Sequence, residues 1–187
     1  VQWKARVGSS NQVALDSEQY QDSVWTHAVG TYDGTDLKLY VDGVLKTTTN
    51  SSGTLGSNSI GITIGSTNDN LYFDGRISQA RIYSSALSAS EVLQNYNATK
   101  TNYTTLITSN LVLHLDAGDS SSYSGSGTTW SDLSGEGNHA TLVNSPTYSS
   151  SNGGYLSFDG SNDHATLPAI DISGNEITFS IWTYAQS

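Results

Sequence analysis

The stretch that decides the fold is residues 25–43, which read WTHAVGTYDGTDLKLYVDG. Residues 25–32 and 37–43 alternate between core-forming and solvent-facing side chains with a period of two, as expected for strands with one buried face. Asp33 and Gly34 lie between them, and glycine accepts the positive φ that tight turns require. This stretch therefore predicts a β-hairpin.

Further segments with a strand pattern surround the hairpin, at residues 1–7, 60–65, 75–83, 111–115, 139–143, 155–158, 163–167 and 178–184. One segment differs, because Ser88 and Glu91 have the spacing of a capping box and apolar residues follow at helical intervals. This pattern predicts a short helix over about residues 88–98. The expected fold class is all-β, an antiparallel sandwich with one short helix.

Composition excludes several classes of protein. The 187 residues include no cysteine, which rules out a disulfide-stapled fold, a cysteine zinc site and thiolate catalysis. The formal charge of −10 repels phosphate backbones, so we expect no nucleic-acid partner. No apolar run approaches the roughly 20 residues of a membrane helix, so we expect no membrane insertion. Because the chain starts at Val1, without an initiator Met or a signal peptide, we expect a processed product or a piece of a longer protein.

Several motifs resemble laminin G-like domains of the concanavalin A-like lectin/glucanase superfamily. Residues 25–43 are similar to the centre of such a domain, and residues 73–83 and 86–92 are similar to its end. Four later motifs resemble its opening, namely LDA at 115–117, WSDLSG at 130–135, LSFDGSND at 156–163 and FSIW at 179–182. The resemblance implies a concanavalin A-like jelly-roll β-sandwich.

The order of these motifs departs from the family, because the centre and end come before the opening. We interpret residues 1–100 as the C-terminal half of a laminin G-like sandwich, 101–109 as a linker and 110–187 as the N-terminal half. Together they amount to about one domain. An isolated half would expose an apolar face and free strand edges, so the halves must pair within one chain or between copies or neighbouring repeats. Pairing between copies would build a head-to-tail assembly.

The residues that would support catalysis are missing. The superfamily's glucanases, by resemblance, need two glutamates and an aspartate alternating on one strand, so that an acid and a nucleophile flank the glycosidic bond. The four glutamates here, at positions 18, 91, 136 and 176, all lie more than ten residues apart. The four histidines lack the spacing of a helical zinc site, and no Gly-x-Ser-x-Gly elbow occurs. We therefore expect no catalytic residues and a protein that is not an enzyme.

Calcium is the one cofactor for which candidate ligands exist. Ca²⁺ takes six to eight oxygen ligands, and residues 159–163 (DGSND) concentrate such oxygens in a short turn. Asp159 and Asp163 with Asp74 form the expected set, and Asp132 marks a second candidate loop. The alternative is that these side chains stabilise turns by hydrogen bonds to the backbone. Both interpretations remain open at this point.

Aromatic residues supply candidate contacts for a carbohydrate. Trp130, Tyr123 and Tyr148 follow or flank loops and are the candidate ligand-binding residues, whereas Trp3, Trp25 and Trp182 lie on strands and are expected in the core. The sequence thus predicts a structural or adhesive module of an extracellular, cell-surface or virion-surface protein, such as a phage fibre or capsid decoration. Its expected partners are copies of itself, neighbouring repeats or a cell-surface glycan. The alternative is a carbohydrate-binding module of a larger secreted glycan-active enzyme.

Overall fold

The computed structural model of the protein describes residues 2–7, 10–15, 23–55, 62–67, 71–101, 105–172 and 174–186. Its strands are β1 (Gln2–Val7), β2 (Ser10–Leu15), β3 (Trp25–Tyr32), β4 (Asp36–Val41), β5 (Val44–Asn50), β6 (Thr63–Ile64), β7 (Asp74–Tyr83), β8 (Leu111–Asp116), β9 (Thr129–Trp130), β10 (Ala140–Val143), β11 (Thr147–Ser149), β12 (Tyr155–Asp159), β13 (His164–Thr166) and β14 (Ile177–Ala185). The helix α1 spans Ala89–Thr101, and a short 3₁₀ turn, η1, spans Ser151–Gly153. The all-β class, with antiparallel strands and one α-helix among the described residues, is confirmed.

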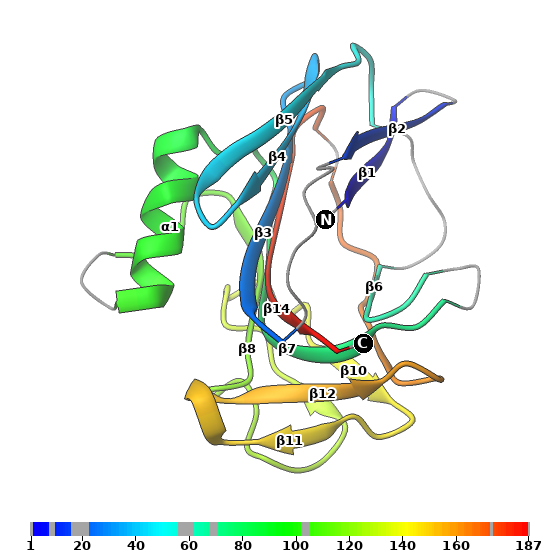
Figure 1. Ribbon diagram of the computed structural model, residues 1–187, viewed down its shortest axis with the longest axis vertical. Helices are drawn as coiled ribbons and strands as arrows, with labels where there is room; N and C mark the ends of the chain where they lie inside the picture. Colours follow the sequence, from blue (N-terminus) through cyan, green and yellow to red (C-terminus); the bar gives the residue numbers. More distant parts are fainter. Residues whose placement is uncertain are drawn as a thin grey trace.

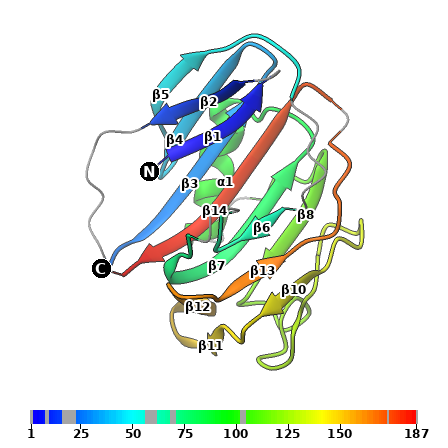
Figure 2. The same cartoon turned by 90° about the vertical axis from the view of Figure 1, so that its right-hand side faces the viewer.

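The large sheet runs in the order β11-β12-β7-β14-β3-β4-β5, with all its strand pairs antiparallel (Figure 2). The long strand β7 pairs along one edge with β12 at its start and with β8 at its end. Its other edge pairs with β14, and β14 in turn pairs with β3. The strand from residues 177–185 therefore lies between two strands from the first 83 residues.

The second sheet joins the same two portions of the chain. Its order is β6-β13-β10-β9, so β6 from the first portion pairs with β13 from the second. Strands of both portions thus form two shared sheets within one molecule. Completing this sandwich does not require strands from another copy. The permuted motif order and an assembly of copies stay predictions.

The main core lies between the large sheet on one side and the β6-β13-β10-β9 sheet and the β1-β2 hairpin on the other (Figure 1). Strand alternation produces this face, since Leu113 and Leu115 of β8 are fully buried and the residues between and after them are only partly so. Trp130 and Phe158 are the largest fully buried side chains of the second portion. This inner face fixes the register, because a slip of one residue would turn each strand inside out.

The helix α1 packs on the opposite, outer face of the large sheet (Figure 1). It covers a second apolar cluster, which consists of Val29, Tyr40, Tyr83, Leu87, Val92 and Leu111. The predicted capping box is confirmed, because Ser88 N donates to Glu91 Oε2 at 2.8 Å and Glu91 N donates to Ser88 Oγ at 3.4 Å. The helix ends at Thr101 and leaves the rest of the outer face to other elements.

The sequence analysis did not predict several of the strands. The strands β2, β5, β9 and β11 were not predicted, and β6 is only Thr63–Ile64 where a strand over 60–65 was expected. Residues 60 and 61 of that prediction lie outside the described residues, as does Val1. β9 and β6 are two residues long, too short for any periodicity. β5 is an edge strand without a fully buried residue, so its pattern shows no apolar face.

Candidate functional site

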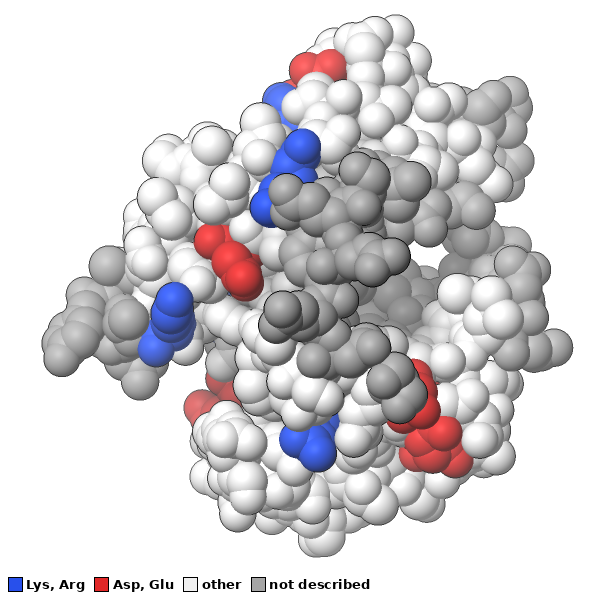
Figure 3. Space-filling model, viewed as in Figure 1, with Lys and Arg blue, Asp and Glu red and all other residues white. Residues whose placement is uncertain are grey.

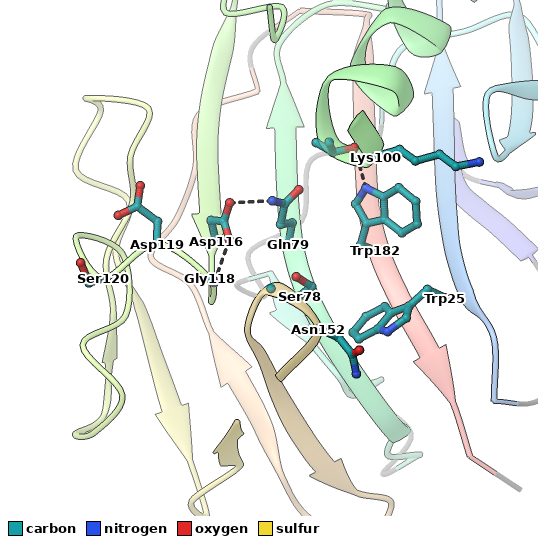
Figure 4. Close-up of a pocket in the computed structure, with 12 residues that line it drawn as sticks. Trp25, Ser78, Gln79, Lys100, Asp116, Gly118, Asp119, Ser120, Asn152 and Trp182 are labelled. Carbon is teal, nitrogen blue, oxygen red and sulfur yellow. Dashed lines mark hydrogen bonds between the residues drawn. The ribbon is translucent and has the colours of Figure 1, made fainter. Parts of the chain in front are cut away.

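A cleft of about 620 Å³ lies on the outer face of the large sheet, next to the end of α1. Four strands supply its floor, with Trp25 from β3, Trp182 from β14, Gln79 from β7 and Asp116 from β8 (Figure 4). Its rim consists of the last turn of α1, the loop after β8 and η1, which contribute Thr99, Lys100, Gly118, Asp119, Ser120, Asn152 and Gly153. Every second side chain of a strand points to the same face of the sheet. The floor therefore consists of side chains from four neighbouring strands that all point to the outer face.

A β-bulge shapes the middle of this floor. Trp182 pairs with Gln79, but the next pair joins Thr183 to Ile77, so Ser78 is an extra residue on β7. Bulges redirect side chains, and here both Ser78 and Gln79 line the cleft. The Ser78 hydroxyl donates to the carbonyl of Gly154 at 2.8 Å. The bulge therefore ties the floor to the rim.

The two tryptophans of the cleft are half-buried and held from the side. Trp182 Nε1 donates to Thr99 Oγ1 at 2.8 Å, and its ring centroid lies 5.1 Å from that of His27. The Trp25 ring lies 5.6 Å from Tyr184 and 5.9 Å from Tyr155. The expectation that Trp25 and Trp182 belong to the core is corrected, since neither indole is fully buried and both line the cleft. Trp3 lies in β1, but its side chain is outside the described part of the structure.

Asp116 is the half-buried carboxylate of the floor. Its Oδ2 accepts Gln79 Nε2 at 2.6 Å, and its Oδ1 accepts the backbone N–H of Gly118 at 2.8 Å. Burial raises the pKa of Asp116 above its ordinary value, although the Gly118 N–H, the charge of Arg81 and the Gln79 amide act in the opposite direction. The exposed Asp119 adds a second carboxylate to the lining, and its charge raises the pKa of Asp116 further.

Glycines allow the close backbone contact that shapes the rim of the cleft. A Cβ added to Gly118 would collide with the carbonyl oxygen of Gly153, and one added to Gly154 would collide with the Cα of Gly118. Gly154 also has a φ of +94°, which favours glycine. The loop after β8 and the segment around η1 therefore meet backbone to backbone, which leaves the cleft with a defined wall.

Three of the predicted metal ligands lie on neighbouring elements at one corner of the sandwich. Asp74 and Asp159 are opposite each other in β7 and β12, and Asp163 lies on the turn that follows. Asp159 Oδ1 accepts the backbone N–H groups of Ser161 at 2.9 Å and Asn162 at 3.1 Å. Asp163 is 5% exposed, and burial, followed by the charge of Asp159, raises its pKa. The described ranges contain no group of three or more acidic or histidine side chains that could hold a metal ion. The calcium site stays a prediction.

Asp132 lies in a different loop and is saturated by hydrogen bonds. Its Oδ1 accepts the N–H groups of His114 and Ser134 at 2.8 and 2.9 Å, and its Oδ2 accepts Ser134 Oγ at 2.7 Å and the N–H of Asn138 at 3.0 Å. Burial alone would raise the pKa of Asp132, but these hydrogen bonds together lower it. This geometry is the turn-stabilising alternative that the sequence left open.

None of the predicted ligand-binding aromatics lines the cleft. Trp130 is 0% exposed and belongs to the main core, and Tyr123 is 4% exposed with its hydroxyl donating to the carbonyl of Gly127 at 2.9 Å. A ring buried to this extent has no face to offer a ligand, which corrects the assignment of Trp130 and Tyr123 as ligand contacts. Tyr148 is half-buried and packs on Tyr123 with ring centroids 5.4 Å apart.

The polar residues of the cleft were missed because they carry no motif. Gln79 and Asn152 come from separate strands and loops that only the fold brings together. Asp116 stood in the LDA motif at 115–117, but there it indicated only the family. The available signal was positional, since Trp25 opens one strand and Trp182 lies near the end of another.

The fold and the site define an antiparallel β-sandwich module with a ligand-sized cleft on the outer face of its large sheet. Residues 1–93 match a laminin G family model described as the concanavalin A-like lectin/glucanases superfamily. The first 93 residues are thus similar to this superfamily, and the sandwich is consistent with its fold. No curated protein and no solved structure matches the chain. None of the described helices has the length and apolar character needed to cross a membrane.

Proposed function

We propose that this protein is a non-enzymatic adhesive module that binds a carbohydrate in the cleft between Trp25, Trp182 and Asp116. One observation carries the proposal: two half-buried indole rings share a cleft of about 620 Å³ with carboxylate, amide and hydroxyl groups. A volume of roughly 300–1,000 Å³, aromatic walls and a few convergent polar groups are typical of small-molecule sites.

The chemistry of a sugar ring matches this lining. A pyranose has faces of C–H groups, which pack on the apolar face of an aromatic ring, and a rim of hydroxyl groups. Asp116 and Asp119 accept hydrogen bonds from hydroxyls, whereas the amides of Gln79 and Asn152 both donate and accept. The cleft thus offers stacking surface and directional contacts for one ligand.

A binding role fits better than hydrolysis. Retaining or inverting hydrolysis requires one carboxyl group as acid and another as nucleophile or base, at a set separation across the bond. Both oxygens of Asp116 already accept hydrogen bonds from within the protein, and the described residues that line the cleft include no glutamate. We assign no catalytic step to these residues.

The family supports an extracellular setting, because laminin G-like domains are typically extracellular. On the face drawn in Figure 3, the basic side chains of the described residues are few and scattered, which argues against a basic patch for nucleic acid there. Attachment to a glycan-bearing surface is the adhesive role that we propose. A carbohydrate-binding module of a larger enzyme would use the same cleft.

Titration with a panel of neutral and charged oligosaccharides tests the proposal, with tryptophan fluorescence and calorimetry as readouts. We expect saturable binding by at least one glycan and a loss of about tenfold or more in affinity for Trp25→Ala and for Trp182→Ala, since about 1.4 kcal/mol corresponds to tenfold. Tyr72→Ala, an aromatic substitution outside the cleft lining, is the matched control and should bind like the native protein.

Two results would overturn the proposal. One is the absence of saturable binding across the panel. The other is binding that survives both tryptophan substitutions, which would place the ligand elsewhere. Release of reducing ends from a bound glycan would contradict the non-enzymatic part alone.

A further inference from the structure

A chain of hydrogen bonds leads from the cleft into the protein. Arg81 lies on β7 two residues after Gln79, so the two side chains lie on the same face of the sheet. Arg81 Nη2 donates to Gln79 Oε1 at 2.8 Å, and Gln79 Nε2 donates to Asp116 Oδ2 at 2.6 Å (Figure 4 shows the second bond). Arg81 is 2% exposed, whereas Gln79 and Asp116 line the cleft. These two hydrogen bonds therefore connect the buried guanidinium of Arg81 to the cleft.

The direction of this chain is fixed by chemistry. A guanidinium can only donate, so Gln79 must turn its carbonyl oxygen toward Arg81 and its NH₂ group toward Asp116. The NH₂ group can only donate, so Asp116 must present a lone pair to it. The backbone N–H of Gly118 imposes the same demand on the other oxygen of Asp116. Both oxygens of Asp116 therefore accept a hydrogen bond, and the ionised carboxylate accepts such bonds more strongly than a protonated carboxyl does.

The charge of Arg81 favours the same state. Arg81 has no ion pair within the described residues, and its Nε has no hydrogen-bond partner there. An unpaired buried cation is costly, so the carboxylate of Asp116, one amide away, is the compensating charge. The other charged groups at this site are Asp119, which opposes ionisation of Asp116, and Lys100, whose Nζ donates to Tyr96 Oη at 2.8 Å and points away from the carboxylates in Figure 4. The neighbouring histidines, His27 and His114, have a lowered pKa because of burial and, next, the charge of Arg81.

We propose that Arg81 is a positioning residue that, through Gln79, holds Asp116 as an ionised hydrogen-bond acceptor and thereby selects neutral or amino sugars over carboxylated or sulfated ones. The part of this inference that concerns the sugar rests on the proposed function. The part that concerns the ionisation of Asp116 does not. An anionic sugar would face two carboxylates, Asp116 and Asp119, whereas the cation of the described lining, Lys100, donates to Tyr96 and points away from them in Figure 4. A hydroxyl or ammonium group instead finds two acceptors.

The first measurement concerns the free protein and uses carboxyl ¹³C chemical shifts of aspartate across pH. We expect Arg81→Met and Gln79→Met both to raise the midpoint of the Asp116 titration by at least half a pH unit, because each breaks the chain. Asp119→Asn, which removes an opposing charge outside the chain, should lower it. If Arg81→Met fails to fold, Gln79→Met decides the question, since its side chain is only partly buried. An Asp116 midpoint that is unchanged in the folded variants overturns the proposal.

The second measurement compares affinity for a neutral oligosaccharide between pH 5 and pH 8. We expect Gln79→Met to lose at least threefold more affinity at pH 5 than at pH 8 relative to the native protein, and Asp119→Asn to lose no more at pH 5 than at pH 8. We also expect the carboxylated analogue of the same sugar to bind at least tenfold more weakly than the neutral one. Tighter binding of the anionic analogue overturns the selectivity. If no sugar binds at all, the proposed function fails while the titration still decides the role of Arg81.

Discussion

The outer face of the large sheet has two halves that are built from the same strands. One half is covered by α1, and the other is open and forms the cleft. In the covered half, Val29 of β3 and Tyr83 of β7 pack with Leu87 and with Val92 of α1. In the open half, Trp25 of β3 and residues of β7 and β14 line the cleft. The strands continue without interruption from one half to the other. The difference arises where the helix ends, at Thr101.

A polar layer separates the two halves. His27 and Arg81 are fully buried there, with His27 Nε2 hydrogen-bonded to Ser180 Oγ at 2.9 Å. The Tyr96 ring of α1 stacks on His27, 5.8 Å between centroids. The comparison teaches that an aromatic residue on a strand becomes core or site according to the element that covers it. Trp130 and Trp182 have the same side chain, and only the first is covered on all sides.

Acid should have the largest effect, and it should act on the polar layer. Burial and then the charge of Arg81 lower the pKa of His27 to about 3 and of His114 to about 4. Both are neutral in the fold, whereas unfolded histidines bind protons below about pH 6.5. Stability is therefore present above pH 6.5 and is lost as pH falls toward 4, by roughly 1 kcal/mol per pH unit for each histidine.

Urea denaturation at pH 8, 7, 6, 5 and 4 measures this slope, and the values at pH 8 and 7 serve as the baseline. His27→Gln should reduce the slope by about half, because it removes one of the two titrating groups. A free energy of unfolding that stays constant between pH 7 and 4.5 would show that the layer takes up protons in the folded state.

A large-to-small substitution distinguishes the two halves most directly. Leu87→Ala, beneath the helix, should reduce the free energy of unfolding by about 2–5 kcal/mol because it leaves a cavity. Trp25→Ala, in the open half, should cost less than about 2 kcal/mol because the indole is only half-buried. Urea denaturation measures both. Equal losses would mean that the cleft wall is as much a part of the core as the helix contact.

The hydroxyl of Tyr83 tests the boundary between apolar cluster and polar layer. It donates to the carbonyl of Ile107 at 3.1 Å and accepts Asn95 Nδ2 at 3.0 Å. Tyr83→Phe leaves both groups unpaired in a buried place and should cost about 1–3 kcal/mol. A double-mutant cycle with Asn95→Ala should give a coupling energy above about 0.5 kcal/mol, and additive losses would contradict the contact.

The smallest effect should come from the start of the helix. Ser88→Ala removes the cap and should cost about 1 kcal/mol. Hydrogen exchange should then speed up for the amides of the first turn of α1 and remain unchanged in β14, where the cap plays no part. Exchange that rises equally in both would show that the helix and the sheet open together.

The sequence predicted the features that depend on local pattern. The hairpin at 25–43, the strand at 75–83 and the cap at Ser88 follow from periodicity and side-chain chemistry within a few residues. The site did not follow, because Asp116, Gln79 and Trp182 come from three strands whose neighbours are set by sheet order. The bulge at Ser78, which sends two consecutive side chains into the cleft, has no local signature either.

The central place of β14 has a consequence for how the chain reaches its native state. Residues 177–185 separate β7 from β3, so the large sheet cannot close until a segment about 100 positions downstream has joined it. Contacts of such long sequence separation slow folding. Until β14 has been synthesised, the edges of β3 and β7 that pair with it remain unpaired. A chaperone or a neighbouring nascent chain can bind these edges during that interval.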